Sequence, residues 1–120
     1  MRSKWIQHKG ERILYQDFSN LFFQVAAVKQ ELVEVVSLVV NEPLNSVLVL
    51  SDFRDTQITS ELMPIMNDSS KKTKDHVRKT AVLGVTGMKR TLGDLLSRIT
   101  GQQLMYFDDE AAAKDWLTTV

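Results

Sequence analysis

The sequence predicts an α/β domain with a mixed, mainly parallel sheet of four or five strands and about four helices. Two observations point to this class: short apolar runs typical of buried strands alternate with helical patterns, and the connections between them are short. The chain has 120 residues, of which 43% are hydrophobic and 25% charged, as in one ordinary domain. We therefore expect residues 1–120 to form a single domain.

The N-terminus is predicted to form a β-hairpin. Trp5–Gln7 and Arg12–Gln16 resemble strands, and Gly10 between them supplies the positive φ that a tight turn favours. A long amphipathic helix is expected over Leu21–Val40, because apolar residues recur at helical spacing up to Pro43. Four polar side chains of this helix are expected largely in solvent: Gln24, Lys29, Glu31 and Glu34.

The next strand and helix are predicted between residues 46 and 76. Ser46–Ser51 is a continuous apolar run bounded by polar residues, which is typical of a strand buried on both faces of a parallel sheet. A crossover helix should follow it, with Thr59 or Ser60 as the cap and Pro64 near the end of its first turn. Its apolar stripe consists of Ile58, Leu62, Ile65 and Met66.

Two further strand–helix units complete the chain. The strands are Thr80–Val85 and Gln102–Phe107. A helix that ends at Gly101 should place one apolar face inward after the first of them: Met88, Leu92, Leu95, Leu96 and Ile99. A last helix, capped by Asp108 or Asp109, should bury four side chains: Ala112, Ala113, Trp116 and Leu117.

Composition excludes several classes of function. Fifteen Lys and Arg balance fifteen Asp and Glu, which removes the whole-molecule argument for binding nucleic acid. The absence of cysteine excludes a disulfide framework, a thiolate zinc site and a cysteine nucleophile, and it fits a cytoplasmic location. His8 and His76 lack the spacing of a metal pair, so no metal or other cofactor is expected.

No membrane-spanning or secretory segment is expected either. The N-terminal nine residues carry charge but are not followed by the apolar stretch of a signal peptide. The most apolar window, Leu21–Val40, contains three charged residues, which cost too much in a transmembrane helix.

The net charge of zero conceals a segment, Lys71–Arg90, with a local charge of +6. An acidic partner or a headgroup surface would suit this segment, and a solvated helix end and loop is the simpler interpretation.

The order of elements, with a strand that ends in Asp52, resembles the STAS (SpoIIAA-like) fold of bacterial anti-sigma-factor antagonists. Val77–Lys89 and Phe107–Leu117 are similar to a group of small, largely uncharacterised bacterial STAS-like proteins. In signalling members, a kinase-like anti-sigma factor phosphorylates Ser or Thr at the start of the following helix. The resemblance implies Thr59 or Ser60 as the phosphosite, although the loop Phe53–Ile58 before them lacks the glycine of the family's motif. The alternative is an unmodified cap.

Two loops are expected to share one crevice, because the carboxyl ends of neighbouring parallel strands meet at one edge of the sheet. They are Asp52–Ser60 and Gly84–Arg90. The second loop combines a hydroxyl, two cations and free N–H groups of a helix N-terminus, which suits an anion or an acidic partner. The candidate binding residues are Asp52, Thr86, Gly87, Lys89 and Arg90. A helix cap at Thr86 without any ligand is the alternative.

The predicted function is a non-enzymatic regulatory or interaction module, with a kinase-like regulator or another signalling protein as partner. The alternative is a small-ligand or lipid-binding domain, like the lipid-transfer domains of the CRAL-TRIO type, with the Leu21–Val40 helix as a lid. An enzyme would rest only on Asp52 and Asp55, and no catalytic residue is assigned. A sheet edge or an apolar face would permit a homodimer.

Overall fold

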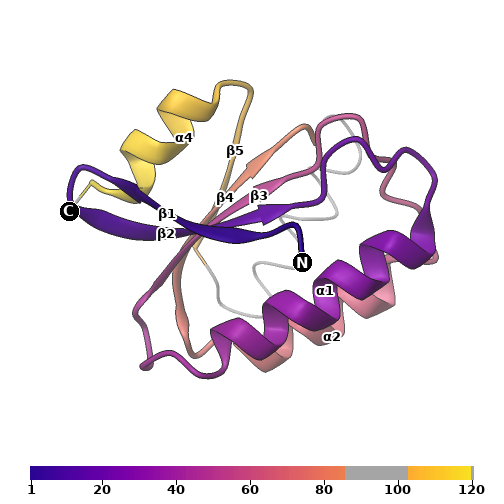
Figure 1. The fold of residues 1–120 in the computed structure, drawn as a ribbon, viewed down its shortest axis with the longest axis horizontal. Helices are drawn as coiled ribbons and strands as arrows, with labels where there is room; N and C mark the ends of the chain where they lie inside the picture. The colour runs from indigo at the N-terminus through magenta and orange to yellow at the C-terminus, as the bar shows by residue number, and fades with distance from the viewer. Residues whose placement is uncertain (86–102, 120) are drawn as a thin grey trace.

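The computed structural model describes residues 1–85 and 103–119 of the chain. Five strands form one sheet in the order β1-β2-β3-β4-β5, in which only β1 and β2 are antiparallel (Figure 1). The strands are β1 (Lys4–His8), β2 (Glu11–Asp17), β3 (Val47–Asp52), β4 (Val77–Leu83) and β5 (Leu104–Phe107). The predicted mixed, mainly parallel sheet is confirmed.

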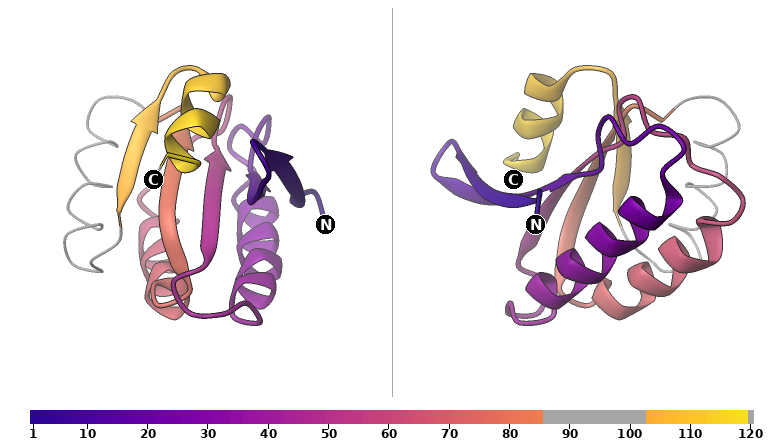
Figure 2. Two further views of the ribbon diagram at one scale, coloured as in Figure 1. Left: turned by 90° about the vertical axis from the view of Figure 1, so that its left-hand side faces the viewer. Right: turned by 45° about the vertical axis from the view of Figure 1, so that its right-hand side comes forward.

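Three described helices cover the two faces of this sheet (Figures 1 and 2). The helices α1 (Val25–Val39) and α2 (Met63–Thr73) lie on one face, and α4 (Glu110–Leu117) lies on the other. Right-handed crossovers between neighbouring parallel strands put α1 and α2 on the same side. The predicted helix over Met88–Ile99 and its cap at Gly101 lie outside the described residues.

The core accordingly has a layer on each side of the sheet. Phe18, Leu32 and Phe53 are buried between the sheet and the helices α1 and α2, where the rings of Phe18 and Phe53 stack. On the other face, Leu83 and Leu117 belong to the layer beneath α4. Both faces of β3 are covered, and all of its residues are buried, as the continuous apolar run predicts.

The predicted N-terminal hairpin with Gly10 in its turn is confirmed, and the turn has two residues. Lys9 and Gly10 both have positive φ, of 50° and 80°, which is the pattern of a type I′ turn. At its tip, His8 Nε2 and Lys9 Nζ lie 2.8 and 3.1 Å from the Asp115 carboxylate. The hairpin therefore reaches across to the end of α4.

The first helix begins later than predicted, at Val25 instead of Leu21. Asn20 and Phe22 have left-handed φ values of 57° and 50°, which an α-helix cannot contain. The prediction that Glu31 lies in solvent is also wrong. Its buried carboxylate accepts hydrogen bonds from Ser3 N (2.8 Å) and Ser3 Oγ (2.6 Å), because the N-terminal segment crosses α1 there.

The predicted cap of the second helix at Thr59 or Ser60 is wrong. The helix α2 begins at Met63 after a turn over Thr59–Leu62, and no side chain caps it. Pro64 explains this start, since its ring is tolerated in the first turn but would clash with the preceding turn of a helix that began at Ser60. The helix then continues through the polar stretch to Thr73.

The last helix follows the prediction more closely. Asp109 caps it, with Oδ2 accepting a hydrogen bond from Ala112 N at 3.0 Å. Ala113 and Leu117 are buried and Trp116 is half-buried against Phe107. Ala112 is exposed, contrary to the prediction, because it lies about 100° around the helix from Ala113.

Candidate functional site

The carboxyl ends of β2 and β3 carry two loops that are hydrogen-bonded to each other along their length. Four main-chain bonds of 2.7–3.0 Å join them: Phe18 N to Asp52 O, Asn20 N to Arg54 O, Phe22 N to Asp55 O and Gln57 N to Phe22 O. We call these two segments, Phe18–Gln24 and Asp52–Ser60, the loop edge. Three of its residues have left-handed φ values, namely Asn20, Phe22 and Asp55, and one of these bonds joins Phe22 to Asp55.

Thr56 fixes the loop edge from inside. Its buried hydroxyl donates a hydrogen bond to the Phe18 carbonyl and accepts one from Leu21 N at 3.0 Å. A buried hydroxyl with both roles satisfied holds its neighbours in one arrangement. The loop edge is therefore a rigid platform.

Gly84 joins the end of β4 to the same platform. Its φ is +84°, and a Cβ at this position would lie only 2.5 Å from the backbone N of Arg54. Phe53 N also donates a hydrogen bond to Leu83 O at 2.9 Å. The loops after β3 and β4 thus start in direct contact. Four residues of the predicted crevice lie outside the described residues: Thr86, Gly87, Lys89 and Arg90.

Asp52, the predicted site aspartate, is completely buried and holds Arg54 in place. Its Oδ1 accepts hydrogen bonds from Arg54 N and Nε, both at 3.0 Å. Its Oδ2 accepts from Arg54 Nη2 at 2.7 Å and from Tyr15 Oη at 2.5 Å. Arg54 Nη2 also lies 3.0 Å from Glu110 Oε1 on α4. Asp52 itself is not presented at the surface, and the group that its carboxylate positions is the half-exposed guanidinium.

The electrostatics of this cluster keep all its members in one charge state near neutral pH. Burial would raise the pKa of the Asp52 carboxyl, but the hydrogen bonds from Arg54 and Tyr15 outweigh burial and hold that pKa below its usual range. Burial and the hydrogen bond to Asp52 raise the pKa of the Tyr15 phenol. The cluster is a fixed ion pair with a neutral phenol, and it contains no group poised to exchange a proton.

The two predicted phosphosites differ in access. Thr59 Oγ1 is buried and has no hydrogen-bond partner among the described residues. Ser60 is exposed in the turn that precedes α2. Of the two hydroxyls, only that of Ser60 is open to a modifying enzyme in this conformation.

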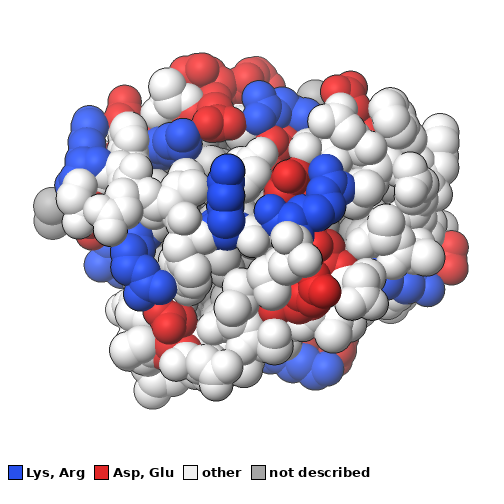
Figure 3. Space-filling model, viewed as in Figure 1, with Lys and Arg blue, Asp and Glu red and all other residues white. Residues whose placement is uncertain are grey.

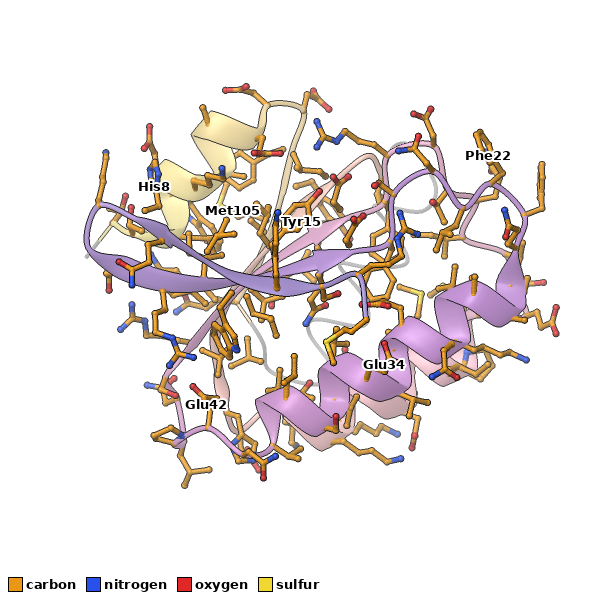
Figure 4. All side chains as sticks on the ribbon, in the orientation of Figure 1. His8, Tyr15, Phe22, Glu34, Glu42 and Met105 are labelled. Atoms are coloured by element: carbon orange, nitrogen blue, oxygen red, sulfur yellow. The ribbon has the colours of Figure 1, made fainter. Side chains whose placement is uncertain are left out.

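The sequence reasoning missed two residues of the loop edge. Phe22 is 57% exposed and projects outward at the N-terminal end of α1 (Figure 4). A signal existed, because Phe22 falls outside the apolar stripe formed by Val25, Val28 and Leu32. Arg54 had no such signal, since nothing in the sequence shows which carboxylate a loop arginine binds.

A mainly apolar cavity of about 130 Å³ lies between the sheet and the helices α1 and α2. Its walls include Val35, Phe53 and Met66, and hydroxyls of Ser70 and Thr80 line it as well. This volume is close to that of an apolar cavity that binds benzene.

The basic segment does not form one continuous surface in its described part. Lys72 pairs with Asp68 at 3.0 Å and Arg78 with Glu11 at 3.3 Å. Lys79 donates to the carbonyl oxygens of Trp116 and Thr119 near the end of α4. On the face seen in Figure 3, Lys and Arg are interspersed with Asp and Glu.

Two kinds of site are absent from residues 1–85 and 103–119. No group of three or more His, Asp or Glu side chains could hold a metal ion there. No helix in this part of the chain is long and apolar enough to cross a bilayer.

Comparison with known proteins identifies the fold. No family model matches the chain, and no curated protein matches it significantly. A solved structure of an uncharacterised protein of the DUF3478 family from Shewanella loihica, described as having a SpoIIAA-like fold, superposes with a TM-score of 0.71. The match covers 96% of this chain and 91% of that one at 14% sequence identity. The chain therefore has the SpoIIAA-like fold of STAS domains, as the element order predicts.

Proposed function

We propose that this chain is a non-enzymatic interaction module of the STAS type, and that its protein partner docks on the loop edge. The observation that carries the proposal is the four-bond connection between the two loops, which fixes the exposed Phe22 and Arg54 on a rigid backbone. A surface that is already ordered loses little conformational entropy when a partner binds.

The exposed side chains of the loop edge suit a protein partner. Aromatic residues and arginine are enriched among the residues that dominate interface energies. Phe22 provides an apolar anchor. Asp52 and Glu110 occupy Arg54 Nε and Nη2, so the Nη1 group is the part of the guanidinium that could donate to a carbonyl or carboxylate oxygen of the partner. A kinase-like regulator or another signalling protein is the partner class that the fold suggests.

A phosphate on Ser60 would control this docking. It would add about two negative charges beside the exposed Asp55 and Glu61, in the turn before α2. Like charges would then accumulate on the part of the loop edge that a partner with an acidic acceptor approaches. We expect phosphorylation of Ser60 to release such a partner.

The docking proposal is tested by affinity capture followed by direct binding. Wild-type protein, Phe22→Ser and Met105→Ser are immobilised, and captured proteins are identified by mass spectrometry. Met105 is the matched control, since it is an exposed apolar residue on β5, on the α4 side of the sheet (Figure 4). The proposal predicts a partner that wild type and Met105→Ser retain and Phe22→Ser loses. Equal capture by all three proteins contradicts it.

The phosphorylation proposal has its own test. The protein is incubated with ATP and the cell extract, and intact mass is measured for wild type, Thr59→Ala and Ser60→Ala. We expect a mass increase of one phosphate that only Ser60→Ala abolishes. No added phosphate, or a phosphate lost in Thr59→Ala alone, contradicts the assignment to Ser60.

The second candidate function is binding of a small apolar molecule in the cavity under α1 and α2. Its volume favours a compact ligand over a lipid chain. The proposed lid movement of α1 would break the buried contacts of Glu31 with the N-terminal segment, so we expect ligands to enter without it. Native mass spectrometry in the presence of benzene-sized aromatic compounds should show one bound molecule, and a chain that stays bare would exclude this function.

A further inference from the structure

We propose that the chain self-associates through the outer face of α1, as a parallel, two-fold symmetric dimer. The occupant of this face is a second copy of the chain. The α1 surface shares only Phe23 with the loop edge, and its other residues lie along the helix or just after it, so the two proposals are tested by different variants.

Exposed apolar side chains concentrate around α1. Among the described residues, the large ones in this class are Met1, Phe22, Phe23, Val33, Val40, Leu44 and Met105. Only Met105 lies on an element apart from α1 and its flanking segments, since the amino group of Met1 is 3.9 Å from the Glu34 carboxylate. Scattered apolar residues are normal on a protein surface, whereas a group gathered on one element marks an interaction site.

The outer face of α1 has the spacing of a helix–helix seam. Ala26, Gln30, Val33, Ser37 and Val40 follow one another at alternating intervals of four and three residues, and all five are exposed. We call these five residues the α1 stripe. None of them is charged, and the stripe lies opposite the core positions Val28, Leu32, Val35 and Val39. A seam of this period allows two helices to pack side by side.

The charges beside the stripe favour a second copy in parallel orientation. Lys29 and Glu34 flank Val33 on opposite sides of the stripe, and they are five residues apart. In a parallel helix pair, residues with this spacing face each other across the seam. Lys29 Nζ lies 3.6 Å from the exposed Glu61 carboxylate within one copy, and in the dimer it would exchange this surface pair for Glu34 of the other copy. An antiparallel pair centred on Val33 would instead bring the two Glu34 carboxylates together.

A lipid surface fits the stripe poorly. The charged residues of α1 are Lys29, Glu31 and Glu34, so the helix has no excess of cations for anionic headgroups. Glu31 is buried against the N-terminal segment, so one ammonium and one carboxylate, those of Lys29 and Glu34, would be drawn toward the membrane surface. The stripe is therefore suited to a protein surface of the same kind.

The area of exposed apolar side chains around α1 sets the expected affinity of the dimer. Val33 (67%) and Val40 (41%) lie on the stripe, and Phe23 (74%) and Leu44 (69%) lie in the segments just before and after α1. Their burial would remove roughly 400 Å² from water in each copy, which with flanking contacts reaches the low end of specific interfaces. We therefore expect a reversible dimer with a dissociation constant of about 10–100 µM.

Sedimentation velocity over a concentration series tests the proposal. Wild type and the control Met105→Glu should dimerise with the same constant, and Val33→Glu should raise that constant at least tenfold while circular dichroism shows an unchanged fold. Glu34→Lys should weaken the dimer, and the double variant Lys29→Glu/Glu34→Lys should restore it. A monomer at every concentration, or a Val33→Glu dimer as strong as wild type, overturns the proposal. The proposal is also overturned if the wild-type protein stays monomeric and binds lipid vesicles, and Val33→Glu abolishes that binding.

The absence of cysteine from the sequence provides a test of orientation. In a parallel dimer, Val40 faces the same residue of the second copy, so Val40→Cys should form a disulfide-linked dimer on mild oxidation. Met105→Cys serves as the control for random collision. Two results together would overturn the parallel arrangement. The first is that Val40→Cys cross-links no more than Met105→Cys, and the second is that Ala26→Cys forms a disulfide with Val40→Cys when the two variants are mixed.

Discussion

Replacing Asp52 by Asn should destabilise the protein strongly, because this carboxylate is the buried centre of the loop edge. It accepts two hydrogen bonds on each oxygen, three of them from the Arg54 side chain or Tyr15 hydroxyl and one from Arg54 N. Asparagine removes the charge and turns one acceptor into a donor that faces other donors.

The magnitude follows from the burial of the two partners. Removing one partner of a fully buried ion pair costs about 3–5 kcal/mol. Arg54 is half-exposed and regains water, so we expect a loss near the lower end, about 3 kcal/mol at pH 7. For a domain of this size the melting temperature should fall by about 10 °C.

The pH dependence supplies a second, independent check. The pKa of the Asp52 carboxyl is lowered in the folded protein, so its stabilisation is complete above the unfolded pKa and is lost as pH falls through the folded value. The difference between wild type and Asp52→Asn should therefore be constant from pH 7 to about pH 5 and shrink below about pH 4.

Urea denaturation followed by circular dichroism measures both effects. Asp115→Asn is the control, because Asp115 pairs with Lys9 and contacts His8 Nε2 on the surface, where such interactions contribute little. A loss below about 1 kcal/mol for Asp52→Asn at pH 7, or a loss that grows as the pH falls, would refute the reasoning.

Three further predictions concern single contacts. Gly84→Ala should lower the unfolding free energy by about 3 kcal/mol, because φ is positive there and the new Cβ would clash with the Arg54 backbone. Gly10→Ala, which also has positive φ but open space around it, should lower it by about 1 kcal/mol. Equal losses for the two variants in chemical denaturation would contradict this. Glu31→Gln should cost about 2 kcal/mol and speed amide hydrogen exchange at Ser3, because the buried carboxylate binds that amide; unchanged exchange would argue against the contact. Thr59→Val should keep or increase the melting temperature, since Oγ1 has no partner among the described residues, and a large decrease would show that the hydroxyl is satisfied.

Local patterns predicted most of the fold. The turn at Lys9–Gly10, the buried run of β3 and the cap at Asp109 each depend on residues within a few positions of one another. Right-handed crossovers then determine on which face the helices α1 and α2 lie. The start of α2 was also predictable in principle, because Pro64 marks the first turn of a helix.

The errors arise where distant segments meet. Glu31 on α1 is buried because Ser3, which is distant in the sequence, donates hydrogen bonds to its carboxylate. The residues before α1 leave the helical pattern because the loop after β3 binds their backbone at Phe22. Sequence spacing predicted Asp52 as a candidate site residue but gave no indication that its carboxylate is buried and bonded to Arg54. Such long-range hydrogen bonds leave no periodic signal in one sequence.

The most direct test of the docking account is the affinity of a captured partner for wild type, Phe22→Ser and Met105→Ser, measured by isothermal titration calorimetry. An aromatic anchor at the centre of an interface contributes about 2 kcal/mol or more. The account predicts binding to Phe22→Ser at least about 30-fold weaker than to wild type, with Met105→Ser unchanged. Equal affinity of all three proteins would contradict the assignment of the loop edge as the docking surface.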